Sequence, residues 1–131
     1  MPASHLSAVI DRDSVCAGDD CEPHEAKVFV SHDSSVVEFL ASALRVSPLA
    51  SISSGEATWL IDTAGPGNGC IGVIAQQWTA PKLLIPETTT IEALFGEKTP
   101  TVFFRYWCQA DPEAVFEALK AGRELPSRYR Q

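Results

Sequence analysis

The segment that most limits how this chain can fold is the turn Gly65-Pro66-Gly67-Asn68-Gly69. It lies between two apolar runs of strand length, residues 57–63 and 70–76. Glycine and asparagine tolerate the positive φ angles of tight turns, so the segment predicts an antiparallel hairpin. A phosphate-binding loop is disfavoured, because a strand rather than a helix follows and the lysine and hydroxyl residues of that motif are missing.

Four further runs predict strands around this hairpin. Residues 26–31 alternate, with Val28 and Val30 on one side of the strand and Phe29 on the other. Residues 101–109 are the most aromatic run, and their poor alternation predicts that this strand is covered on both faces. Residues 5–10 predict a first strand. Residues 82–85 predict a short edge strand, because a proline flanks the run on each side.

Two helices are predicted from capping residues and apolar spacing. In the first, Asp33 or Ser34 caps a stripe of apolar residues at helical spacing, and Pro48 ends the segment; the stripe is Val37, Leu40, Ala41 and Leu44. In the second, Asp111 caps, Pro112 takes the first helical position and Gly122 stops the helix. Residues 90–95 predict one further helical turn that ends at Gly96.

The order of these elements predicts an α+β fold. Short connections between successive strands favour a mainly antiparallel sheet of about five to six strands, with two helices packed on one face. The opening strand–strand–helix–strand order is compatible with a mixed, β-grasp-like sheet. The length of 131 residues suits a single domain spanning 1–131. Within it we expect an acidic loop at 11–25 and a polar, frayed tail at 123–131.

The charge is negative and unevenly spread. The formal net charge is −7 at pH 7, and residues 1–25 hold six acids against the single base Arg12. Such a surface repels phosphate backbones, so we expect no nucleic-acid partner. It suits a basic protein partner through steered association, although moderate negative charge also serves solubility alone.

Localisation is predicted from what the chain lacks. The sequence contains no run of about 20 apolar residues, the length that a membrane-spanning helix needs. Residues 1–10 lack the basic and apolar regions of a signal peptide. We therefore expect a cytoplasmic protein with no membrane partner, in which the four cysteines are thiols or metal ligands rather than disulfides. The oligomeric state is left open by the sequence.

One segment has the residue types of a metal site. Cys16, Cys21 and His24 lie within nine positions of the acidic loop, and thiolate and imidazole ligands suit zinc. The spacing lacks the paired C-x2-C knuckles that make zinc motifs specific. The ordinary interpretation is two loop or core cysteines and a surface histidine.

Two groups of residues are candidates for partner binding. Arg105 and Trp107 share one face of their predicted strand with Phe103, and aromatic rings beside an arginine are typical of interface hot spots. The second group comprises the loop acids Asp19, Asp20 and Glu22. No nucleophile, base or paired-carboxylate motif of high specificity appears, so no catalytic residue is predicted.

These observations favour a small acidic, cytoplasmic protein-interaction module without catalytic activity, either an adaptor or an inhibitor or immunity-type protein. Its expected partner is a protein, and a basic one on grounds of charge. No cofactor is predicted for this function. The alternative is a small zinc-binding metalloprotein that uses the Cys/Cys/His loop.

Overall fold

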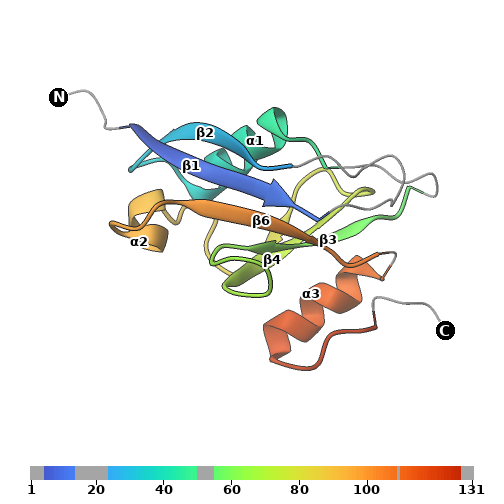
Figure 1. The fold of residues 1–131 in the computed structure, drawn as a ribbon. Helices are drawn as coiled ribbons and strands as arrows, with labels where there is room; N and C mark the ends of the chain where they lie inside the picture. The colour runs from blue at the N-terminus through green and yellow to red at the C-terminus, as the bar shows by residue number, and fades with distance from the viewer. Residues whose placement is uncertain (1–4, 14–23, 50–54, 109, 128–131) are drawn as a thin grey trace.

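The structure is a computed structural model, and it describes residues 5–13, 24–49, 55–108 and 110–127. Strands and helices follow one another along the chain as the turn and capping signals predict (Figure 1). The elements are β1 (His5–Arg12), β2 (Ala26–Ser31), α1 (Val36–Val46), β3 (Thr58–Asp62), β4 (Cys70–Ala75), β5 (Lys82–Leu83), α2 (Ile91–Phe95), β6 (Thr101–Tyr106) and α3 (Pro112–Ala121).

The strands form one mixed sheet in the order β2-β1-β6-β3-β4-β5. Only the β1–β6 pair is parallel among the described strands; the other neighbours are antiparallel. The β1–β2 hairpin, the helix that follows it and the central parallel pair make this order β-grasp-like, which confirms the predicted α+β class. The β3–β4 hairpin and the edge position of β5 are also confirmed.

The two long helices pack on opposite faces of the sheet. Trp59 and Ile61 of β3 belong to the main core, which includes Phe39 and Leu40 of α1. Leu60, between them in sequence, packs instead with Val115 of α3. Because side chains alternate across a strand, these neighbours lie on different faces. The prediction that the helices cover a single face was therefore wrong.

The first helix begins later than predicted. Its N-cap is Ser35 rather than Asp33 or Ser34, and a capping box joins Ser35 to Glu38. The buried residues are Val36, Phe39, Leu40 and Ala43. Val37, which the predicted stripe included, is 38% exposed. The apolar surface of this helix is wider than one stripe, so periodicity alone did not determine which side faces the sheet.

Strand β6 is shorter and more regular than predicted. It ends at Tyr106, and Cys108 beyond it has a positive φ of 57°. Val102 and Phe104 are buried while their neighbours are half-buried, so the strand alternates; none of its residues is exposed, which agrees with the predicted cover on both faces.

The bounds of the acidic loop and of the tail also differ from prediction. Strand β1 continues to Arg12, so Asp11 belongs to the sheet rather than to the loop. In the tail, Pro126 accepts a hydrogen bond of 2.8 Å from Trp107 Nε1, and Leu125 packs beside α3. The tail therefore packs on the domain as far as Pro126.

Candidate functional site

Part of the sheet face that carries α3 is not covered by a described helix. Helix α3 contacts β4, at one side of the sheet, and α1 contacts β2 from the opposite face. In Figure 1 the β2–β1–β6 half has no helix in front of it. We call the side chains of this half the open face, and by strand register they include Ser7, Val9, Asp11, Lys27, Phe29, Thr101 and Phe103.

Phe29 is the most exposed large apolar side chain among the described residues. It is 72% exposed, although both β2 neighbours on the opposite side of the strand, Val28 and Val30, pack against the main core. Its cross-strand partner on β1 is the small residue Ser7. Phe29 therefore presents its ring to solvent from the edge strand of the sheet.

A pocket of about 300 Å³ lies on the open face. Val9, Thr101 and Phe103 line it from the neighbouring strands β1 and β6. The β3–β4 loop adds a further wall through Ala64, Gly65 and Pro66. The remaining lining residues are Asp11, Glu25 and Val102. The pocket thus combines an apolar interior with two carboxylates, and we call it the acid-rimmed pocket.

Of the two carboxylates, Asp11 lies in β1 and Glu25 directly precedes β2. The β1–β2 register ends with Ile10 opposite Ala26, and the next residue on each chain, Asp11 and Glu25, lines the pocket at this end of the pair. Asp11 Oδ1 accepts a hydrogen bond of 2.8 Å from the backbone N–H of Arg12. Neither carboxylate forms an ion pair with a residue in the described part of the chain. Two carboxylates that line one pocket give its rim a negative charge, which favours a cation over an anion.

A buried ion pair supports the wall of the pocket. Asp62 Oδ2 accepts a hydrogen bond of 2.8 Å from Gly67 N in the β3–β4 loop. The same oxygen lies 3.0 Å from Nε of Arg105 on β6. Burial raises the pKa of the Asp62 carboxyl, and the contacts from Gly67 and Arg105 oppose this increase only in part. These contacts connect two strands and the loop.

The structure places Arg105 and Trp107 together, as the sequence predicted, but with internal partners. The Arg105 guanidinium lies 5.3 Å from the centre of the Trp107 ring. Its charge faces Asp62, and the Trp107 ring packs in the cluster beneath α3. Both side chains therefore take part in packing and ion pairing within the domain.

The other predicted site residues are mostly outside the described residues. These are Cys16 and Cys21 of the proposed zinc site, and the loop acids Asp19, Asp20 and Glu22. His24 is described and half-buried. Across residues 5–13, 24–49, 55–108 and 110–127, no three histidine, cysteine or acidic residues lie close enough to hold a metal ion. The zinc site stays a prediction.

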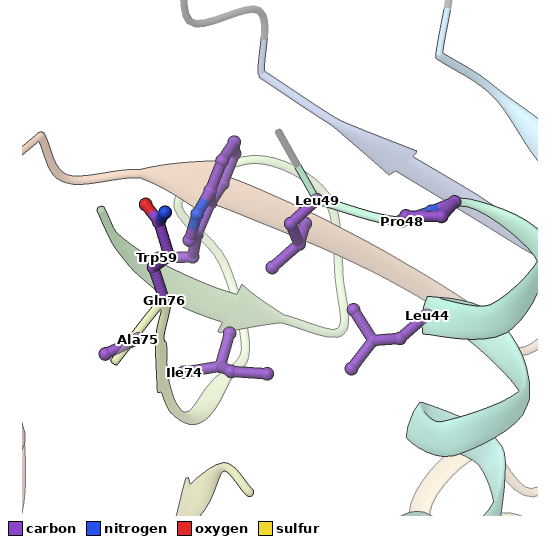
Figure 2. A pocket seen from close by; sticks show the side chains of 7 residues that line it. All are labelled: Leu44, Pro48, Leu49, Trp59, Ile74, Ala75 and Gln76. Carbon is purple, nitrogen blue, oxygen red and sulfur yellow. The ribbon is translucent and has the colours of Figure 1, made fainter. Parts of the chain in front are cut away.

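A second pocket, of about 280 Å³, opens on the other face of the sheet (Figure 2). Leu44 and Leu49 approach it from α1 and the segment after it, and Trp59 and Ile74 from the sheet. Pro48, Ala75 and Gln76 complete the lining. No acid, base or thiol from the described part of the chain lines this pocket, so it offers apolar contact rather than chemistry.

The thiol nearest to the ion pair belongs to Cys70, a half-buried free cysteine at the start of β4. Burial raises the pKa of Cys70, and its Sγ lies 3.5 Å from the carbonyl oxygen of Gly72. A thiol whose pKa is raised stays protonated at neutral pH, and the thiolate is the reactive form. This cysteine is therefore suited to packing more than to covalent catalysis.

Comparison with protein-family models, curated proteins and solved structures found no match to this chain. Within the described residues, no helix has the length and apolar character needed to cross a membrane.

Sequence reasoning missed most of this surface. Asp11 and Glu25 belong to the predicted acidic loop, but the sequence does not predict that they share a pocket with Val9 and Phe103, because that proximity depends on strand pairing. Phe29 had a readable signal: it is an aromatic residue on the otherwise polar side of an alternating strand, between Lys27 and Ser31.

Proposed function

We propose that this chain is a small, acidic, cytoplasmic protein-interaction module without catalytic activity, and that it binds its partner through the open face. The observation that carries this proposal is the exposed Phe29 ring on a sheet surface with no described helix over it. An apolar ring held in water costs free energy that a binding partner recovers.

The local structure supports an interface rather than an incidental exposed residue. Phe29 lies on an edge strand, and the open face continues from it across Val9 to Phe103 and the acid-rimmed pocket. An aromatic anchor beside a pocket is the arrangement in which a few residues supply most of the binding energy. The rigid sheet beneath holds these side chains before binding, which lowers the entropic cost of association.

Site-specific photo-crosslinking in the native host tests this proposal. Phe29 is replaced by the photoreactive analogue p-benzoylphenylalanine, and a second variant carries the same analogue at Val46. Val46 is a matched control because it is also an exposed apolar residue, 50% accessible, but lies at the end of α1.

We expect a discrete crosslinked protein from position 29 that is weak or missing from position 46. Adding excess unlabelled wild-type protein should reduce this crosslink, and adding the Phe29→Ser variant should not. Equal crosslinking from the two positions, or none from position 29, would refute the open face as the binding surface.

A further inference from the structure

We infer that the acid-rimmed pocket receives a lysine or arginine side chain from a basic segment of the partner protein. This inference rests on the proposed function and specifies the chemistry that the open face recognises. It draws on three features of the described residues: the apolar interior of the pocket, the two carboxylates beside it and the scarcity of competing cations.

The interior of the pocket suits the stem of a basic side chain. Val9 and Phe103 offer an aliphatic and an aromatic surface, and Pro66 adds another from the loop. Lysine and arginine bury their methylene stems on such surfaces while the charged group stays at the rim. The Phe103 ring also offers a face for cation–π contact.

The carboxylates supply the charge complementarity. Asp11 and Glu25 both line the pocket at the end of the β1–β2 pair, and neither has an ion-pair partner among the described residues. A bound cation would gain two ion pairs at the edge of an apolar surface. The net charge of −7 also attracts a basic partner from a distance, so the charge of the whole chain and the charge of the pocket favour the same kind of partner.

Neighbouring cations do not neutralise this site. Lys27 shares the open face opposite Val9, but it is exposed and forms no ion pair with the described residues. Arg105 faces Asp62. Arg12, next to Asp11 in the strand, points to the other side of the sheet and donates from Nη1 to the carbonyl oxygen of Asp13. An anionic ligand or membrane surface would meet two carboxylates and is disfavoured.

The test uses short peptides as probes and nuclear magnetic resonance as the readout. Hexaarginine and hexalysine are titrated into the ¹⁵N-labelled full chain, with hexacitrulline as the control that matches arginine in shape but carries no side-chain charge. We expect chemical-shift changes centred on Val9, Asp11 and Thr101 with the two basic peptides, and much weaker binding of hexacitrulline.

Two charge-matched double variants separate local from general attraction. Asp11→Asn with Glu25→Gln removes the two carboxylates of the pocket. Glu87→Gln with Glu117→Gln removes the same net charge from exposed positions outside the pocket lining. We expect the first pair to weaken basic-peptide binding about tenfold relative to the second, the size of two partly exposed ion pairs.

Three results would overturn the inference. These are equal weakening by the two double variants, equal binding of hexacitrulline, and shift changes centred on residues 19–22 of the acidic loop. Each of them leaves the crosslinking result at position 29 unaffected, so failure of basic side-chain recognition is distinguishable from failure of the interaction function.

Discussion

Asp62 is completely buried and forms an ion pair with Arg105, whose side chain is 23% exposed, at 3.0 Å between Oδ2 and Nε. Because Asp62 also holds Gly67 at 2.8 Å, the pair connects β3 and β6 to the loop that walls the acid-rimmed pocket. The carboxylate is thus surrounded by groups that fix the shape of the candidate site. Its partners are the first targets for mutation.

Arg105→Met should destabilise the domain. The substitution keeps an unbranched side chain for packing but leaves the buried Asp62 carboxylate without its cation, at a cost of about 3–5 kcal/mol. Urea unfolding at neutral pH measures the change. Arg45→Met is the control, because Arg45 is exposed in the last turn of α1 and should change stability by less than about 0.5 kcal/mol. Equal losses in the two variants would contradict a structural role for the ion pair.

Asp62→Asn should change how stability depends on pH. Burial raises the pKa of Asp62 in the folded state above its ordinary value of 3.8. The folded protein therefore binds this proton more tightly than the unfolded chain does. The stability that comes from this tighter proton binding by Asp62 is fully present below pH 3.8, and it is lost as pH rises through the folded-state pKa of Asp62.

The measurement is the free energy of unfolding of wild type minus that of Asp62→Asn, from about pH 3 to pH 7. We expect this difference to fall as pH rises above the unfolded-state pKa. A difference that rises with pH over the same window would mean that Arg105 and Gly67 outweigh burial and lower the pKa of Asp62.

Gly72→Ala should weaken the edge of the sheet. A Cβ at this position would lie 2.4 Å from the carbonyl oxygen of Lys82, so β5 must move away from β4. We expect a loss of about 1–3 kcal/mol, the usual cost of overpacking, measured as a lower Tm. Gly122→Ala is the comparison, because its Cβ meets open space and its φ of 70° and ψ of 25° lie in the left-handed region, which costs alanine only about 1–2 kcal/mol. A clearly larger loss at position 122 would contradict this account of Gly72.

Phe29→Ser should leave folding almost unchanged. Phe29 is 72% exposed, so its removal should alter the free energy of unfolding by less than about 0.5 kcal/mol. Phe39→Ala, at a position 1% exposed in the main core, should cost about 3–5 kcal/mol. Chemical denaturation of the two variants provides the comparison. A loss for Phe29→Ser near that of Phe39→Ala would place the ring in the core instead of at an interface.

The predicted zinc site has its own test. If Cys16, Cys21 and His24 bind zinc, native mass spectrometry of protein purified without chelator will give a mass one zinc ion above the 14.2 kDa chain. Cys21→Ser should lose this ion and lower the Tm, and chelator should lower the Tm of the wild type. A bare mass together with an unchanged Tm in chelator would remove the metalloprotein alternative.

Local sequence signals located most of the elements. Asp111, Pro112 and Gly122 mark the two ends of α3 as predicted, because each acts through its own backbone preference within one turn of the helix. Strand β2 has the predicted bounds, since strict alternation over six residues has no helical interpretation. The glycine-rich loop forms the hairpin connection for a similar reason, with positive φ angles at Gly67 and Gly69.

The same signals were ambiguous where several neighbouring residues could fill the same role. Three successive polar residues precede α1, and only the closed capping box with Glu38 selects Ser35. Around β6 the sequence alternates poorly because a charged residue, Arg105, and an aromatic one, Trp107, share one side of the chain. Both are accommodated inside the domain, Arg105 by its ion pair with Asp62 and Trp107 by packing beneath α3.

What the sequence by itself determined is the set of elements, the α+β class and the acidic surface, because propensity, capping and charge are properties of neighbouring residues. The tertiary structure alone decided the parallel β1–β6 pair, the burial of Asp62 and the proximity of Asp11 to Glu25 and Phe103. It also decided that α3 covers β4 and leaves Phe29 exposed. Each of these depends on contacts between residues far apart in the chain, and such contacts are selected by the packing of the whole domain.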